Sequence, residues 1–475
     1  MKTFYDYLVI QKGRQDYIGD LASSAMDDSA APKEGDLEQW RGHLISNSAC
    51  AEILEALELA WVEHQEEFEI CKEKFSIISL EELSEVLGLT VKEDKTNKII
   101  TFLCLLSAYT ENSQFNITFN APSSSGKSYI PLEVSSLYPK ADVIKVGYCS
   151  PTAFFHDQST WNKDTFTYHM SLERKILIFL DQPHMQLLGH LRPFLSHDEK
   201  EIKIKITDKS QKHGLKTKNV IIRGYPSVIF CSAGLKIDEQ EATRFLLLSP
   251  ETTQEKLKCG IQEALSKESD SQAYTANLKR NSQRQSLIQR IIAIKAENIQ
   301  DIKIPDDLRK YIEQWFFQNH KILNPRHQRD IKRISSIIKS IALLNLWHRE
   351  IIGQHTILIS RGDVDAGFKI WEEISFSQEL NLSPYVYKIY TEVILPLYND
   401  KKSGLTRKEL LQGHIKVYKR PLDEWKLGRE IIPMLESAGL VTEEGDPQDK
   451  RRKLIVPIYP TTQFELNEPK NNIDW

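Results

Sequence analysis

The spacing of apolar residues changes along the chain and divides it into segments with different predicted structures. Over residues 1–71 apolar side chains recur at helical spacing, first at Phe4, Tyr7 and Leu8 and again from Ile53 to Trp61. The polar stretch DDSAAPKEGD lies between these patterns and predicts a loop. We therefore expect residues 1–71 to form a small all-helical domain.

A second pattern begins at residue 72 and predicts an α/β core over residues 72–250. A helical pattern at 97–110 is followed by QFNITFNA, whose alternation predicts a strand, and then by a second helix at 127–138. Further strands are predicted in KILIFLDQP (175–183) and PSVIFCSA (226–233). The first of these carries five consecutive apolar residues, which suits a parallel strand that is buried on both faces.

A β-hairpin is predicted within this core. Ile202, Ile204 and Ile206 alternate with lysines, and residues 220–223 are again typical of a strand. The tip is basic, and we list its candidate contacts for nucleic acid as Lys209, Lys212, Lys216 and Lys218. The hairpin is either a solvated surface feature or a probe that projects into a ring pore and contacts phosphates.

Composition limits the remaining possibilities. The 475 residues are enough for three or four domains, and the formal net charge of −4 gives no overall attraction to nucleic acid or anionic membranes. The six cysteines form no C-x-x-C pair, which fits a reducing compartment. The polar N-terminus does not match a signal peptide, and no stretch approaches a membrane-spanning length. We expect a cytoplasmic protein with no membrane partner, in which any nucleic-acid contact comes from local basic patches.

Residues 121–128 read APSSSGKS and differ at one position from the phosphate-binding pattern G-x-x-x-x-G-K-[ST]. Gly126 permits a tight turn whose N–H groups face phosphate oxygens, Lys127 reaches the β- and γ-phosphates, and Ser128 offers a hydroxyl to Mg²⁺. The preceding strand and the following helix are the context that this motif requires. The predicted ATP-binding residues are Ala121, Pro122, Ser123, Ser124, Ser125, Gly126, Lys127 and Ser128.

An acidic residue at the end of the second core strand complements this loop. Asp181 is the predicted second Mg²⁺ ligand, together with Ser128. Gln182 occupies the position where many ATPases carry a glutamate that polarises the attacking water. An amide orients water but accepts a proton poorly, so hydrolysis is either slow or uses another base such as Glu173 or Glu199. Ser232, at the end of the third core strand, is a candidate sensor of the γ-phosphate.

The C-terminal part contains the pattern of a winged helix over residues 379–462, followed by a tail at 463–475. A helix is predicted at 384–398, a second starts after the cap signal at Thr406, and a third runs through PLDEWKLGREIIPMLESAGLV, with Trp425 inward. A hairpin wing follows. Its returning strand carries the predicted nucleic-acid contacts Lys450, Arg451, Arg452 and Lys453. This arrangement suits docking to DNA, although winged helices also bind proteins.

Two family resemblances follow from these motifs. Residues 1–71 resemble the YozE-type helical domain, through Met-Lys-x-Phe-Tyr-x-Tyr-Leu at 1–8 and Ala60-Trp61. The order of phosphate loop, Asp-Gln strand, basic hairpin, sensor strand and Thr-Arg-Phe resembles the AAA+ ATPases of the pre-sensor-hairpin group. Within that group it is most similar to minichromosome-maintenance-like helicases and replication ATPases of phages and mobile elements.

The second resemblance adds roles that the residues alone do not give. It implies that Arg244 reaches the nucleotide of a neighbouring subunit and that residues 251–378 form a helical lid. Arg329, or else Arg326 or Arg333, would contact phosphate from that lid. The combined hypothesis is a multidomain, ring-forming homo-oligomer, taken as a hexamer, that uses ATP and Mg²⁺ to move along DNA. It would hold a single strand in its pore and contact duplex at the winged helix. The alternatives are a slowly hydrolysing ATP switch in transposition or defence, and a non-enzymatic DNA-binding adaptor.

Overall fold

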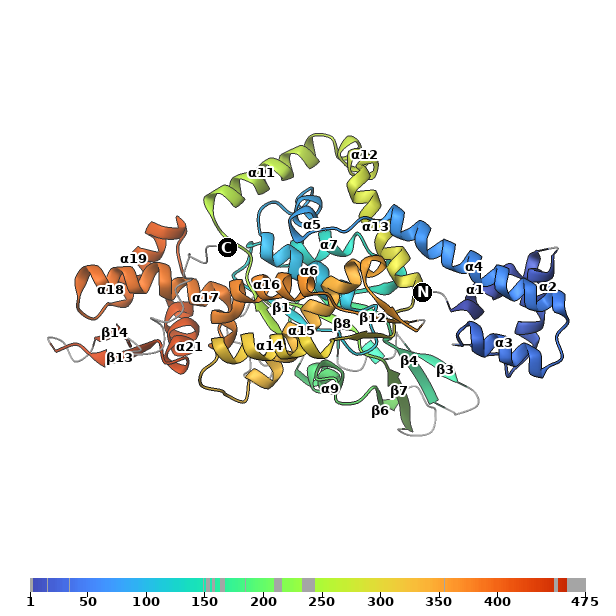
Figure 1. Ribbon diagram of the computed structural model, residues 1–475. Helices are drawn as coiled ribbons and strands as arrows, with labels where there is room; N and C mark the ends of the chain where they lie inside the picture. The colour runs from blue at the N-terminus through green and yellow to red at the C-terminus, as the bar shows by residue number, and fades with distance from the viewer. Residues whose placement is uncertain are drawn as a thin grey trace. The chain divides into compact units, whose positions relative to one another are not determined.

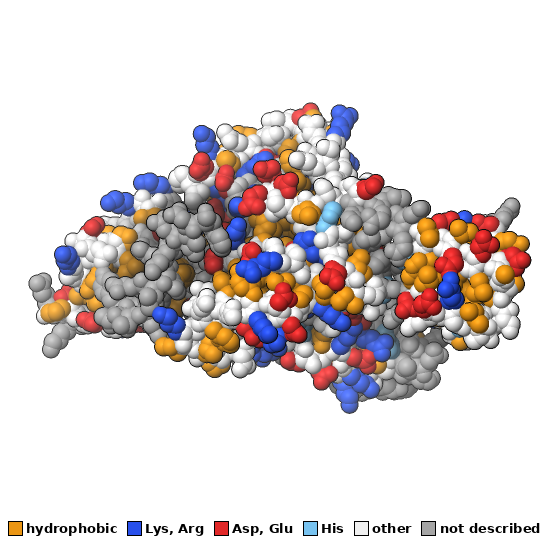
Figure 2. Space-filling model, viewed as in Figure 1, with side chains coloured by type: hydrophobic (Ala, Val, Ile, Leu, Met, Phe, Trp, Pro, Cys, Tyr) orange, Lys and Arg blue, Asp and Glu red, His pale blue; other side chains and the backbone are white. Residues whose placement is uncertain are grey.

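The computed structural model describes most of the chain and is shown in Figure 1. Acidic and basic side chains are interspersed over the face that Figure 2 shows, in keeping with the small net charge of −4. The described residues are 3–14, 16–33, 35–147, 149–150, 154–155, 159–162, 167–183, 185–208, 216–232, 244–353, 355–447 and 452–458.

The N-terminal segment is all-helical, as its apolar spacing predicts. Side chains of Thr3, Asp16 and Asp36 each accept a hydrogen bond from a backbone N–H in the first turn of a helix, which fixes where three of the helices begin. Phe4 and Trp40 are buried and meet edge to face, with ring centroids 5.5 Å apart. The elements are α1 (Phe4–Ile10), η1 (Gln11–Gly13), α2 (Tyr17–Asp27), α3 (Leu37–Ser46) and α4 (Ala51–Lys74).

A five-stranded sheet follows, with the order β2-β5-β8-β1-β9. The neighbours β2 and β5 are parallel, and so are β5 and β8, whose register pairs Ile176 with Ser227 and Phe179 with Phe230. Every residue of β5 and of β8 is buried, which explains why these strands are continuous apolar runs. The strands are β1 (Ile117–Asn120), β2 (Val143–Val146), β5 (Ile176–Phe179), β8 (Ser227–Ser232) and β9 (Leu246–Leu248).

Among the helices that accompany this sheet, α6 and α7 lie at the positions that the sequence predicts. Along α6 a continuous stretch of eleven residues, Asn97–Ser107, is buried, which marks it as a core helix rather than an amphipathic surface one. The Cys104 thiol, near its end, donates a 3.1 Å hydrogen bond to the carbonyl of Phe115, just before β1. The helices of this part are α5 (Leu80–Leu87), α6 (Lys95–Ser107), α7 (Tyr129–Ser135), η2 (Lys140–Asp142) and α9 (Met185–Leu195).

The predicted hairpin exists and belongs to a second sheet with the order β3-β4-β7-β6. β6 (Glu201–Asp208) and β7 (Lys216–Arg223) are antiparallel and pair over their full length, from Glu201–Arg223 to Asp208–Lys216. The partner strands β3 (Thr160–Asn162) and β4 (Thr167–Ser171) are not predicted by the sequence pattern. Lys209 and Lys212 lie outside the described residues, and only the backbone of Lys216 and Lys218 is described.

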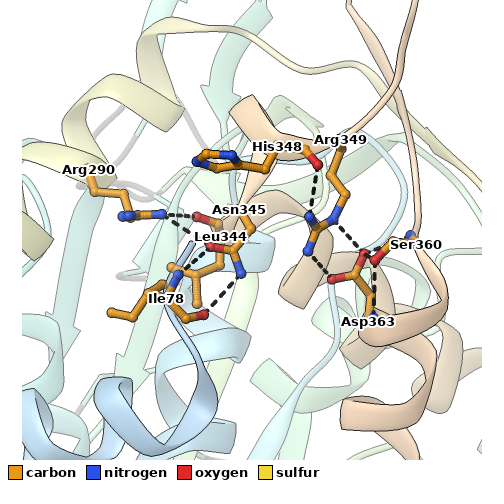
Figure 3. A network of polar contacts seen from close by, with 8 residues as sticks. All are labelled: Ile78, Arg290, Leu344, Asn345, His348, Arg349, Ser360 and Asp363. Atoms are coloured by element: carbon orange, nitrogen blue, oxygen red, sulfur yellow. Dashed lines mark hydrogen bonds and ion pairs between the residues drawn. The ribbon is translucent and has the colours of Figure 1, made fainter. Parts of the chain in front are cut away.

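Residues 254–379 are mainly helical, with a small sheet of order β10-β12-β11 among them. Figure 3 shows two polar contacts of this part, one to residue 78 and one within it. Both side-chain groups of Asn345 bond the backbone of Ile78, at 2.9 and 3.1 Å, and Arg349 forms a two-point ion pair with buried Asp363, at 2.6 and 2.7 Å. The elements are α11 (Gln254–Ser269), α12 (Ser271–Arg280), α13 (Ser282–Ala296), β10 (Asp301–Lys303), α14 (Asp306–Asn319), α15 (His327–Leu344), η3 (Leu346–His348), β11 (Ile351–Ile352), β12 (Thr356–Leu358) and α16 (Arg361–Glu379).

The C-terminal part contains three helical runs and a hairpin around a core of their own. Two π-helical turns interrupt the first and third runs, and each ends two residues before a proline, Pro396 or Pro433. Proline has no N–H to donate to the carbonyl four residues earlier, which accounts for both turns. The elements are α17 (Pro384–Ile389), η4 (Tyr390–Ile394), α18 (Leu395–Lys401), α19 (Arg407–Tyr418), α20 (Glu424–Lys426), η5 (Leu427–Ile431), α21 (Ile432–Ser437), β13 (Val441–Gly445) and β14 (Lys453–Pro457).

Two expectations for this part need correction. Trp425 is 62% exposed rather than inward, because the buried face of the third helical run begins at Leu427. The returning strand of the hairpin begins only at Lys453, with Arg452 directly before it, while Lys450 and Arg451 lie outside the described residues. The predicted cap of the second helix is confirmed, since Thr406 and Glu409 form a capping box.

By its contacts the chain divides into two compact units. One consists of residues 1–117, 128–231 and 259–373, and the other of residues 118–127, 232–258 and 374–475. The second unit therefore joins the end of β1 and most of the 121–128 loop to β9 and the C-terminal part, although these segments are far apart in sequence.

Candidate functional site

The loop at residues 121–128 begins directly after the buried strand β1. Two of its residues have left-handed backbone conformations, Ser124 at φ 60° and Gly126 at φ 88°. A Cβ atom added at Gly126 would meet nothing within 4 Å, so glycine is required there by the backbone conformation and not by lack of space. The loop thus turns tightly at the position where the phosphate-binding pattern requires glycine.

Ala121, the departure from that pattern, fits its position. It is 1% exposed, and its backbone lies outside the left-handed region, so an L-residue adopts it without strain. Its N–H donates a hydrogen bond to the carbonyl of Ser232 at 3.4 Å. The missing first glycine is therefore replaced by a small buried side chain at an ordinary strand exit.

Two hydroxyl groups of the loop are notable. The Oγ of Ser125 is buried and has no hydrogen-bond partner among the described residues, which is costly unless a ligand satisfies it. The side chain of Ser128 does not cap the helix α7 that follows it. Both observations fit a loop whose polar groups serve a bound anion and its metal ion.

The carboxyl ends of the core strands meet at one edge of the five-stranded sheet. Asp181 and Gln182 follow β5, Ser232 ends β8, and the loop follows β1. The register of β5 with β8 and the bond from Ala121 to Ser232 align these three strand ends. Ligands of α/β sheets bind at such an edge.

The polar pair Asp181–Gln182 at this edge is open to solvent. Asp181 and Gln182 are both exposed, and the Asp181 Oδ1 accepts a hydrogen bond from the backbone N–H of Gln182 at 2.8 Å. Ser232 is 5% exposed. Glu173, one candidate for an alternative base, precedes β5 and therefore lies at the opposite edge of the sheet from Asp181.

A buried hydroxyl that sequence reasoning missed ties the loop strand to the C-terminal part. The Ser249 Oγ, just after β9, donates to the carbonyl of Asn120 at 2.7 Å and accepts the N–H of Tyr385 at 3.1 Å. The Gln378 side chain bonds both the N–H and the carbonyl of Leu247 in β9, at 2.9 and 2.8 Å. No local motif marks Ser249 or Gln378, because their partners are 129 to 136 residues away.

Arg244 lies away from the loop of its own chain. It precedes β9, while Ser249 follows that strand and contacts the last residue of β1. Arg244 and Phe245 form a turn and a bend that lead into β9, and the strand Leu246–Leu248 then separates them from Ser249. Arg244 is therefore placed at the far end of an edge strand from its own phosphate-binding loop.

The arginines of the expected lid have distinct environments. Arg326 and Arg333 are buried and form ion pairs with the buried Asp330, at 3.0 and 2.8 Å, and desolvation lowers the pKa of Arg333 to about 10. Arg329 points to a more open environment and is exposed. Of the three arginines, Arg326 and Arg333 have structural roles, and Arg329 remains the candidate for a phosphate contact.

Comparisons with known proteins agree with part of this picture. The YozE SAM-like fold family matches residues 3–66, so the chain carries a YozE SAM-like domain at its N-terminus. No curated protein matches the sequence. Among solved structures, the crystal structure of a "putative ATPase" from Cytophaga hutchinsonii aligns at 12% identity and a TM-score of 0.33, over 63% of this chain and 88% of that one. A similarity of this level carries no functional argument. In the described part of the chain, no helix combines the length and apolar character needed to cross a membrane.

Proposed function

We propose that this protein is a Mg²⁺-dependent ATPase of the P-loop class. The observation that carries the proposal is the loop at 121–128, which leaves a buried strand at the edge of the sheet where Asp181 and Ser232 also lie. The left-handed Gly126 and the buried, unsatisfied hydroxyl of Ser125 support it. A phosphate group is the ligand that suits a tight turn followed by Lys-Ser.

The residues of this edge divide the chemistry among them. Lys127 neutralises charge on the β- and γ-phosphates, and Ser128 and Asp181 would hold Mg²⁺. When bound, Mg²⁺ screens the phosphate charge that grows toward the transition state. Gln182 orients the attacking water through its amide, and Ser232 provides a hydroxyl beside the loop entrance. These roles need positioned charges and dipoles rather than covalent chemistry.

The rate of hydrolysis depends on Gln182. A neutral amide next to Asp181 cannot accept the proton of the attacking water, and Glu173 is at the wrong end of β5 to replace it. This favours a second candidate function, an ATP switch that binds and assembles but turns over slowly. The first candidate is a motor in which another residue supplies the base; Glu199 does not suit this role, because its neighbour Lys200 bonds Gly224, which lies beside Glu173 and before β8.

We further propose that the protein assembles as a ring, a hexamer in this interpretation, and acts on DNA. Its support is the position of Arg244, which precedes β9 and so lies at the opposite end of that strand from Ser249 and the loop, an arrangement that suits a finger serving a neighbouring subunit. The paired strands β6 and β7 suit a hairpin that contacts single-stranded DNA, and the C-terminal part suits a winged helix. The helicase and mobile-element assignments rest on the family resemblance, whereas Gln182 keeps open the alternative of a DNA-binding adaptor with a degenerate nucleotide site.

The test of the ATPase proposal is equilibrium binding of labelled ATP with Mg²⁺. Lys127→Ala should abolish binding, because it removes the one cationic side chain of the loop. Lys145→Ala removes an exposed charge from the edge strand β2 and should leave binding unchanged, which controls for net charge. Binding of ATP by Lys127→Ala within a few-fold of the unmodified protein would refute the loop assignment.

A further inference from the structure

The C-terminal part contains an open hollow of about 900 Å³ with a strongly positive lining. It carries five cationic side chains and one carboxylate, a net charge of +4, whereas the whole chain has a net charge of −4. The cations come from the first turn of α19, from the π-turn η5 and from the start of β14. The lining residues are Thr406, Arg407, Lys408, Gly428, Arg429, Glu443, Arg452 and Lys453.

Arg407 is the fixed centre of this hollow. Its guanidinium donates to Glu443 at 2.9 Å, while its Nε is buried and has no hydrogen-bond partner among the described residues. A Cβ atom at Gly428 would approach the Arg407 Nη1 to 2.8 Å, so the guanidinium packs where a larger residue has no room. Arg407 is thus held in place with donor capacity left over.

Glu443 positions two of the cations and leaves the lining with a net positive charge. Its carboxylate also accepts a 2.7 Å bond from Lys453, so it holds one cation from α19 and one from β14. Burial opposes its ionisation, but the hydrogen bonds from Lys453 and Arg407 outweigh burial and lower the carboxyl pKa. The lining keeps a net charge of +4.

The lining indicates the class of ligand. Sites for small molecules are mostly apolar with a few polar groups, whereas this hollow is lined almost entirely by charged and polar side chains. Its size and openness suit several anionic groups in a row, and guanidinium groups suit phosphate oxygens. We propose that this hollow is a backbone clamp that binds consecutive phosphodiesters of duplex DNA, with Arg407 as its anchor.

This inference rests on the proposed action on DNA and extends it to residues outside the basic run at 450–453. Phosphate contacts fix position without reading sequence, so the clamp should bind duplexes of different sequence with similar affinity. It should also be strongly salt-dependent, because each contacted phosphate releases condensed counterions.

The test uses the full-length protein and a labelled DNA duplex of mixed sequence in a fluorescence anisotropy titration at several salt concentrations. The clamp variant Lys408→Ala, Arg429→Ala, Arg452→Ala should bind more weakly. Its log–log salt slope should fall by about 2.7, from about 0.9 for each of three lost contacts. These three residues avoid the Arg407–Glu443–Lys453 ion pairs, so the variant should fold.

A matched control removes three charges elsewhere in the same part of the chain, through Lys388→Ala, Lys416→Ala and Lys426→Ala. We expect this control to keep most of the affinity and the slope. Equal losses in both variants would overturn the proposal, because they would show a general charge effect. Displacement of the duplex by polyglutamate at equal charge would also overturn it, in favour of an acidic protein segment. Labelled-ATP binding on the same samples tests the ATPase proposal separately.

Discussion

Ser249→Ala should weaken the attachment of helix α17 to the core sheet. The Ser249 hydroxyl accepts the N–H of Tyr385, which lies in the first turn of α17 and has no partner within the helix. The residue at the usual cap position, Ser383, makes no capping bond, and its buried Oγ has no partner among the described residues. The helix is therefore capped from a strand that is 136 residues away.

The magnitude follows from the two bonds that the hydroxyl makes. Loss of a helix cap typically costs about 1 kcal/mol. Loss of the buried bond to the Asn120 carbonyl costs about 1 kcal/mol more, giving a total of about 2 kcal/mol for local opening. Since 1.36 kcal/mol corresponds to a factor of ten, amide exchange at this site should accelerate about 30-fold.

Native-state hydrogen exchange measures this local opening without requiring the whole chain to unfold in one step. Peptides that cover Tyr385 and Leu246–Leu248 should exchange faster in Ser249→Ala, while peptides in α1 to α3 should not change. Ser383→Ala is the matched control, because it removes a buried serine hydroxyl that bonds nothing, and we expect less than a three-fold change. Equal acceleration in both variants, or none in Ser249→Ala, would refute the assignment of Ser249 as the cap.

Two further predictions concern the reaction. If the protein is a slow switch, Gln182→Glu should raise the rate of ATP hydrolysis at unchanged ATP affinity. If another base already acts, the same change should leave the rate unchanged or lower it. Steady-state phosphate release with and without single-stranded DNA distinguishes these cases. Arg244→Ala should keep ATP binding and lose ATP hydrolysis. Mixing this variant with Lys127→Ala should restore some hydrolysis at mixed interfaces. If light scattering shows that the mixed samples still assemble and hydrolysis is not restored, the result would count against a shared site.

The sequence pattern predicted which segments form strands better than it predicted which strands pair with one another. The buried strands β1, β5 and β8 and the hairpin β6–β7 follow from apolar runs and alternation, because burial and pleating leave direct traces in the sequence. The strand order does not, and neither do β3 and β4, which are short and carry mixed polar and apolar residues. The prediction that Trp425 is buried was wrong, because its apolar character suggested burial but the third helical run leaves it exposed.

Within the candidate site, the sequence predicts the loop at 121–128 because its motif is contiguous, and the tight turn at Gly126 fits that prediction. The roles of Asp181 and Ser232 stay predictions, which rest on parallel strands of one sheet ending at one edge. The sequence could not predict the environments of the arginines at 326, 329 and 333, because only the fold shows that Asp330 takes Arg326 and Arg333 into a buried cluster and leaves Arg329 exposed. The cations of the C-terminal hollow were only partly predicted, since Arg407, Lys408 and Arg429 lie outside the basic run at 450–453 and meet the β13–β14 hairpin only in the folded chain.

The hydrogen bonds of Ser249 connect the strand before the loop at 121–128 to the C-terminal helices. Asn120 is the last residue of β1, and the next residue, Ala121, opens the phosphate loop. The Asn120 carbonyl is held by Ser249, and the same hydroxyl fixes the first turn of α17, so one atom joins the loop strand to the C-terminal helices. A shift of the strand end would have to break one of these two bonds or move α17 with it. Because both bonds are buried, moving together costs less than leaving a carbonyl or an N–H unsatisfied. The geometry therefore favours a joint movement of the loop strand and helix α17.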